Sequence, residues 1–106
     1  MAKYLITADY TVEGVRGVQQ AGGSARRDAV RAALESVGGK LESFHFAFGD
    51  HDAYVIVDIP DNVSTAAVAL TVGASGGAST RTIVLLTPEE VDAAAKQSVS
   101  YTPPGG

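Results

Sequence analysis

The most reactive residue types of the chain lie together in one short segment, Gly49-Asp50-His51-Asp52, between two apolar runs. An imidazole beside carboxylates can act as a general base or supply a metal ligand. The same residues also fit an ordinary tight turn, in which glycine gives backbone freedom and aspartates accept bonds from nearby amides. A metal site needs further convergent ligands. Turn chemistry, proton transfer and metal binding are therefore the alternatives for His51.

Two carboxylates, Asp9 and Asp58, fall inside predicted strands. Burying a carboxylate there is costly unless a cation pairs with its charge. The expected partners are Arg81, in the last predicted strand, and Arg26 or Arg27, at the start of a predicted helix. If no such pair forms, the two carboxylates become candidate pocket groups.

Two further candidates lie on the strands that flank the turn. His45 precedes His51 by six residues, and Tyr54 follows it. A single histidine among apolar neighbours is usually a structural residue, but it becomes a pocket group if its face of the sheet lines a space. The candidate ligand-binding residues are therefore Asp9, Arg27, His45, His51, Tyr54 and Asp58. No catalytic residue, metal ligand or cofactor is assigned.

The elements that must position these groups follow from residue types and periodicity. Runs of β-branched and aromatic residues predict strands at 3–10, 40–48, 52–59 and 79–87. Apolar residues at helical spacing predict helices at 25–37, 63–73 and 88–97. The order β-α-β-β-α-β, with an added C-terminal helix, indicates an α+β ferredoxin-like fold with a four-stranded antiparallel sheet and both main helices on one face.

Several residues indicate where the helices begin and end. Ser24 is the expected N-cap of the first helix, and Gly38-Gly39 ends it. Asn62 or Ser64 is expected to cap the second helix. Thr87, followed by a proline and two glutamates, is a typical N-cap of the last helix.

Two segments are less regular in sequence. Residues 12–23 contain four glycines, so we expect an irregular, mobile loop there. The second helix is rich in alanine and β-branched residues, so it must pack closely on a neighbour. Its expected inward stripe is Val63, Ala67, Leu70 and Ala74.

Strand alternation predicts that neither face of the sheet is simply polar. In the second strand, one face is expected to carry Phe44, Phe46 and Phe48, and the other Leu41, Ser43, His45 and Ala47. An antiparallel sheet with one solvated face alternates cleanly between apolar and polar residues. Because two helices cover only one face, we expect the other face to pack on a second copy of the chain. The predicted assembly is a homodimer, or a larger homo-oligomer, of the dimeric α+β barrel type.

Length and composition set the remaining limits. The 106 residues fit a single domain at 1–97 followed by an extended or disordered tail at 98–106. The absence of cysteine excludes disulfides and thiolate zinc sites. A net charge of −4 disfavours nonspecific nucleic-acid binding. The sequence shows neither a signal peptide nor an apolar run of the roughly 20 residues needed to cross a membrane, so we expect a cytoplasmic protein without a membrane partner.

Three parts of the chain together resemble the GYD domain family over residues 3 to about 96: YTVEG at 10–14, the run at 25–52, and VDIPDN at 57–62. The family signature often reads phenylalanine, glycine, one residue, tyrosine, aspartate. Here the segment is Phe48-Gly49-Asp50-His51-Asp52, with histidine in place of the tyrosine. The resemblance implies a small α+β protein of the dimeric barrel type with no established activity.

These observations leave three classes of function. The first is a small-molecule binding module or a regulatory or accessory subunit, which fits the lack of a complete catalytic constellation. The second is a cofactor-independent enzyme, such as an isomerase, cyclase or monooxygenase, acting on a small and partly apolar substrate. That class rests on analogy of fold alone. The third is a structural subunit of an assembly, which the two apolar sheet faces suggest.

Overall fold

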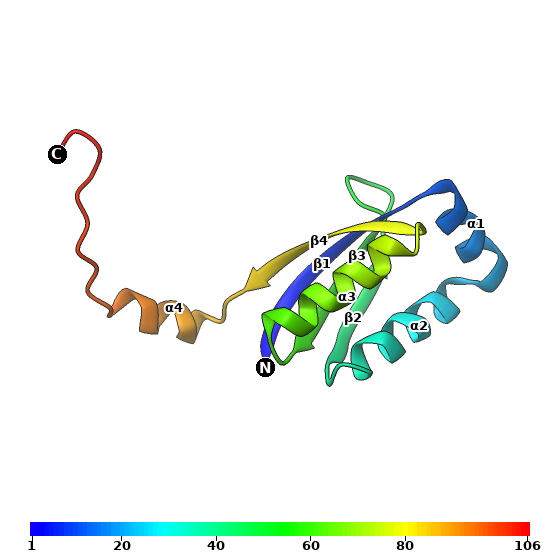
Figure 1. Cartoon of the computed structure of the whole chain (residues 1–106), viewed down its shortest axis with the longest axis horizontal. Coiled ribbons are helices and arrows are strands. Elements are labelled where there is room, and N and C mark those ends of the chain that lie inside the picture. Colours follow the sequence, from blue (N-terminus) through cyan, green and yellow to red (C-terminus); the bar gives the residue numbers. More distant parts are fainter.

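A computed structural model describes residues 1–106 as one α+β domain with a C-terminal extension. Its elements are β1 (Ala2–Tyr10), α1 (Val12–Ala21), α2 (Gly23–Glu35), β2 (Lys40–Phe46), β3 (Ala53–Ile59), α3 (Asn62–Ala74), β4 (Ala78–Leu85) and α4 (Pro88–Ala95). The four strands form an antiparallel sheet in the order β2-β3-β1-β4. The helices α2 and α3 lie on the same side of the sheet (Figure 1). The predicted ferredoxin-like α+β class is confirmed.

The core lies between the sheet and these two helices. Tyr4, Leu34, Val57 and Ile59 are its largest fully buried side chains. Burying an aliphatic side chain of this size stabilises the fold by about 1.5–3 kcal/mol. The phenol of Tyr4 donates a hydrogen bond to Asn62 Oδ1 at 2.7 Å, so its burial leaves no polar atom without a partner.

The glycine-rich segment 12–23 is mostly a regular helix, so the prediction of an irregular loop is wrong. Thr11 caps α1 by accepting a bond from Gly14 N, and its hydroxyl donates to Gly76 O at 2.8 Å. A Cβ on Gly14 would overlap the carbonyl oxygen of Gly77, so glycine is required where α1 docks on the turn between α3 and β4. The cap and this contact offset the roughly 1 kcal/mol that each glycine costs a helix.

Two predicted caps are also displaced. Gly22, with φ of 91°, precedes α2 as its N-cap residue, and Ser24 lies inside the helix. Asp61 caps α3 in place of Asn62 or Ser64, because its carboxylate accepts a bond from Ser64 N at 2.8 Å. This hydrogen bond lowers the pKa of the Asp61 carboxyl below its ordinary value.

The inward side of α3 differs from the predicted stripe. Val63 and Leu70 point outward and are 81% and 74% exposed. The side toward the sheet carries Thr65, Val68 and Val72 instead. Because α3 is apolar on both sides, periodicity could not identify which side packs on the sheet.

The β2 strand contains an irregularity that changes which residues share a face. Its pairing with β3 shifts between Leu41 and Ser43. Leu41 therefore pairs with Val57 and packs on the core, instead of sharing the other face with Ser43 and His45. Phe48 lies beyond the end of the strand and is fully exposed, so it does not continue the face of Phe44.

The C-terminal part of the chain projects away from the domain (Figure 1). Thr87 and Glu90 form the capping box that begins α4, which confirms the predicted helix start. No residue of α4 is buried. The extension raises the radius of gyration to 17.0 Å, against about 13 Å for a compact chain of this length. None of the helices combines the length and the apolar character that crossing a membrane requires.

The docking of α1 predicts opposite effects for two glycine substitutions in the same helix. Gly14→Ala forces the helix away from Gly77 and should lower the free energy of unfolding by about 1–3 kcal/mol. Gly17→Ala meets no atom within 4 Å and should raise it by about 0.5–1 kcal/mol through helix propensity. Urea unfolding of both variants checks the prediction, and equal effects would contradict the close approach.

Candidate functional site

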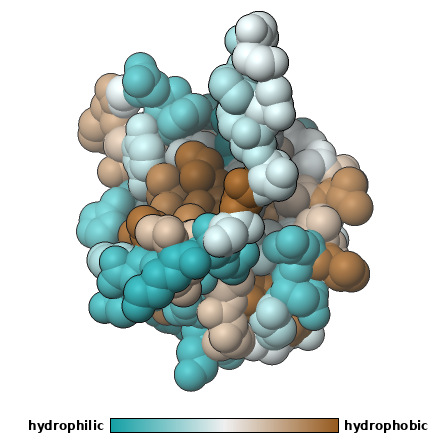
Figure 2. All heavy atoms as spheres, turned by 90° about the vertical axis from the view of Figure 1, so that its left-hand side faces the viewer, coloured by the Kyte–Doolittle hydropathy of each residue, from teal (hydrophilic) through white to brown (hydrophobic).

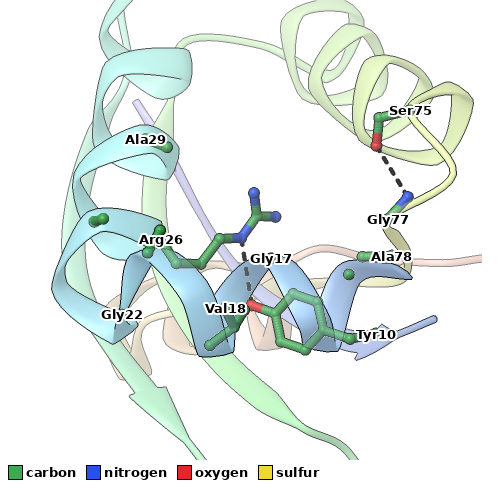
Figure 3. Close-up of a pocket in the computed structure, with 12 residues that line it drawn as sticks. Tyr10, Gly17, Val18, Gly22, Arg26, Ala29, Ser75, Gly77 and Ala78 are labelled. Carbon is green, nitrogen blue, oxygen red and sulfur yellow. Dashed lines mark hydrogen bonds between the residues drawn. The ribbon is translucent and has the colours of Figure 1, made fainter. Parts of the chain in front are cut away.

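A cavity of about 290 Å³ lies between α1, α2 and the start of β4 (Figure 3). Its walls are made mainly of small residues: Gly14, Gly17, Ala21, Gly22, Ala25 and Ala29. These residues come from the inward sides of α1 and α2, where the absence of large side chains leaves the space open. The volume is at the small end of the range found for ligand pockets, so it suits a small molecule.

A second space of about 50 Å³ continues between the helices and the sheet. Aliphatic and aromatic side chains line most of it, including Ile6, Leu34, Val55 and Val72. Tyr10 and Arg26 belong to the walls of both spaces. The two spaces together are called the cleft below. Small residues wall its larger, open part, apolar residues wall its narrow part, and Tyr10 and Arg26 contribute to both walls.

Tyr10 and Arg26 supply the polar groups at the junction. Arg26 Nε donates to the Tyr10 hydroxyl at 3.4 Å, and the guanidinium carbon lies 5.6 Å from the centre of the tyrosine ring. Figure 3 shows the terminal nitrogens of Arg26 directed into the space between α2 and the turn at Ser75 and Gly77. No carboxylate lines the cleft. A mostly apolar space with a few convergent donors is the usual form of a small-molecule site.

The sequence-predicted candidates Asp9, His51 and Tyr54 lie together, but on the opposite, open face of the sheet. His51 Nδ1 is 3.0 Å from Asp9 Oδ2, and the His51 and Tyr54 rings are 5.8 Å apart in an edge-on arrangement. The pair has the geometry of an oriented histidine, without an enclosed cavity around it.

The other candidates are dispersed. His45 pairs with Tyr54 across β2 and β3 and is exposed. Arg27 contacts Asp28 at 3.2 Å on the solvent side of α2 and borders only a shallow surface hollow. Asp58 pairs with Lys3 at 3.3 Å. Nowhere do three or more histidine, aspartate or glutamate side chains converge as metal ligands.

The predicted ion pairs to arginine are therefore wrong. Asp9 pairs with His51 and Asp58 pairs with Lys3, and neither carboxylate contacts Arg26, Arg27 or Arg81. The reason is register, because Lys3 and Asp58 are directly opposite each other in adjacent strands. The Lys3 ammonium lies beside both Glu42 and Asp58, which raises its pKa above the ordinary value.

The GYD domain family matches residues 4–95 of the chain. The chain belongs to the GYD domain family. Comparison with curated proteins and with solved structures gives no match. The matched residues cover all four helices and the strands except the first two residues of β1, so the match extends beyond the ferredoxin-like core into α4.

The turn at residues 49–52 fastens the end of β1. Asp52 Oδ2 accepts a hydrogen bond from Tyr10 N at 2.9 Å, and Asp52 N donates to Ala8 O at 3.0 Å. Asp52 therefore has a structural role. It holds the backbone of Tyr10, whose side chain lies in the cleft.

Sequence reasoning did not place Tyr10 and Arg26 in a common site. The sequence indicates Arg26 as a partner for a carboxylate or as part of a solvated basic helix face, and the cleft walls consist mainly of small residues that carry no chemical signal. The available signal was the spacing of Gly22, Ala25, Arg26 and Ala29 on one side of a helix. That pattern resembles ordinary helix packing, so the cleft of the GYD protein becomes visible only in three dimensions.

The contact between the turn and β1 predicts unequal effects for its aspartates. Asp52→Ala leaves the Tyr10 amide without its acceptor and should lower the free energy of unfolding by about 1–3 kcal/mol. Asp50→Ala removes an exposed side chain and should change it by less than about 0.5 kcal/mol. Thermal and urea unfolding measure both values, and an equally harmless Asp52→Ala would refute the structural role.

Proposed function

We propose that the protein binds a small, mostly apolar organic molecule in the cleft between the helices and the sheet. The observation that carries this proposal is a space of about 290 Å³ whose wall includes the hydrogen-bonded side chains of Tyr10 and Arg26. Such a site suits a binding module or a regulatory subunit.

The residues of the cleft favour binding over catalysis. Tyr10 and Arg26 are its titratable groups, and no histidine or carboxylate faces them. A general base with a pKa near neutrality is therefore missing from the cleft. The His51–Asp9 pair lies on the other face of the sheet, where it cannot reach a molecule held in the cleft. The predicted candidates His45 and Tyr54 pair with each other across β2 and β3 and line neither space of the cleft.

Filling the cleft should abolish ligand binding. Ala29 lines the larger space, and Ala32, on the same helix, lines neither. A screen of small aromatic and aliphatic compounds by thermal shift should give ligands that stabilise the natural sequence, by about 2.7 kcal/mol at one hundred times the Kd. Ala29→Leu should remove this stabilisation and Ala32→Leu should retain it.

The Ala32→Leu variant controls for the added leucine, because it makes the same substitution in the same helix at a position outside the cleft. Native mass spectrometry of the purified protein provides a second readout, since it reports a retained small molecule directly. A screen without any ligand, together with bare chain masses, would reject the proposed function. Ligands that bind Ala29→Leu unchanged would place the site elsewhere.

We also infer that the protein is a homodimer formed through the open face of the sheet. Leu5 pairs with Ile56 on one side and Ile83 on the other, which makes an apolar row across three strands of that face. Polar and charged residues flank the row, as at the rim of an interface. Viewed from the end that carries α4, apolar side chains also gather behind the C-terminal extension, with hydrophilic ones around them (Figure 2).

Substitution of two exposed apolar residues distinguishes a dimer formed through the open face of the sheet from a dimer formed through the outer side of α3. Ile83 lies on the open face and is 49% exposed, and Leu70 lies on the outer side of α3. Light scattering should give twice the 10.8 kDa of one chain for the natural sequence and for Leu70→Glu, and the monomer mass for Ile83→Glu. A monomeric natural sequence, or dissociation by Leu70→Glu alone, would refute the sheet-to-sheet dimer.

A further inference from the structure

The cleft contains an arginine whose charge has no counterpart. The Arg26 side chain forms no ion pair, and its one hydrogen bond is the 3.4 Å contact from Nε to the Tyr10 hydroxyl. Its side chain is partly buried, and its terminal nitrogens point into the larger space (Figure 3). By contrast, Arg27 and Arg31 both contact Asp28. The acidic chain, with a net charge of −4, thus leaves a cation unpaired at its main cavity.

An unpaired guanidinium in a partly apolar space determines what can bind beside it. Removing this group from water is costly unless an acceptor replaces the lost hydration. A planar anion can accept two parallel hydrogen bonds from the terminal nitrogens, and charge-assisted bonds of this kind are the strong ones. The Tyr10 hydroxyl accepts from Arg26 Nε, so its own proton is free to donate to the same ligand.

The number of cations in the cleft limits the charge of the ligand. Arg26 is the one positive group that lines either space. A phosphate carries up to two charges near neutral pH and is usually held by several donors or a glycine-rich loop with a lysine. A carboxylate carries a single charge in a plane that matches one guanidinium. The larger space, of about 290 Å³ and walled partly by Ala21, Ala25 and Ala29, has room for an apolar body, whereas the narrow space of about 50 Å³ does not.

We propose that the ligand class of the cleft is a small apolar carboxylate, with the carboxylate on Arg26 and the Tyr10 hydroxyl and the apolar body in the larger space between α1 and α2. This inference rests on the proposed binding function and adds the chemical class. It assigns ligand recognition to Tyr10 and Arg26.

Matched pairs of an acid and its neutral amide test the class directly. Benzoate and benzamide, 2-naphthoate and 2-naphthamide, and octanoate and octanamide differ in charge at nearly constant shape. Ligand-observed NMR titrations at pH 7 should give Kd values about tenfold lower for the best acid than for its amide, as expected for a charge-assisted bond. Raising the salt concentration should weaken binding of the acid and leave the amide unchanged.

Variants of three residues identify the source of this preference. Arg26→Gln keeps hydrogen-bond donors without the charge, and should reduce the preference for the acid to less than about threefold. Arg26→Lys should retain part of it, and Tyr10→Phe should weaken binding of the acid severalfold. Arg27→Gln, which removes an equal charge from the solvent side of the same helix, should leave the preference unchanged.

The outcomes separate the two proposals. Acids and amides that bind equally well, with both blocked by Ala29→Leu, would overturn the carboxylate class and leave the binding function in place. A preference for acids that Arg27→Gln removes and Arg26→Gln preserves would also overturn it. Failure of every acid and every amide to bind would overturn the class together with the proposed function.

Discussion

The cleft depends on one close backbone contact, the docking of α1 against the turn between α3 and β4. Thr11 donates to Gly76 O, and Gly14 has no Cβ to separate the two segments. This contact holds α1 across the end of the domain, where it forms one wall of the larger space. The helices α2 and α3 form the other walls without meeting closely over the central strands. If α1 moved away, Arg26 would become an ordinary solvated side chain.

The small residues of the cleft have an energetic consequence. Glycine inside a helix costs up to about 1 kcal/mol relative to alanine, yet Gly17 has an alanine-sized space beside it and remains glycine. Packing alone does not require this, since a larger residue at that position would fill space and add helix propensity. Glycine at this position therefore leaves open the side of α1 that faces the larger space.

The sequence predicted the order and type of nearly every element, because strands of β-branched residues and amphipathic helices have distinct periods. It failed where two principles competed. At residues 12–23 the glycine content indicated a loop, but the cap at Thr11 and the tertiary contact at Gly77 outweighed propensity. The sequence predicted the α3 helix correctly. It predicted the wrong inward side, because both sides of the helix are apolar.

The functional residues were harder to predict than the fold for a related reason. Histidine and aspartate attract attention in a sequence, and the structure does bring His51 and Asp9 together. Their pairing across 42 positions could not be inferred from spacing. The cleft, in contrast, is defined by glycine and alanine, whose contribution is the absence of side-chain volume. A cavity formed by small side chains can be recognised only when the positions of the surrounding helices and strands are known.

The turn at residues 49–52 links the two faces of the sheet. Successive residues of a strand point to opposite faces, so Asp9 contacts His51 on the open face while Tyr10 contacts Arg26 in the cleft. Asp52, from the same turn, accepts the hydrogen bond of the Tyr10 amide. A partner that packs on the open face would restrain the turn, and through Asp52 it would restrain the backbone of Tyr10. Asp52 thus connects the backbone of Tyr10, at the edge of the cleft, to the turn whose His51 contacts Asp9 on the open face.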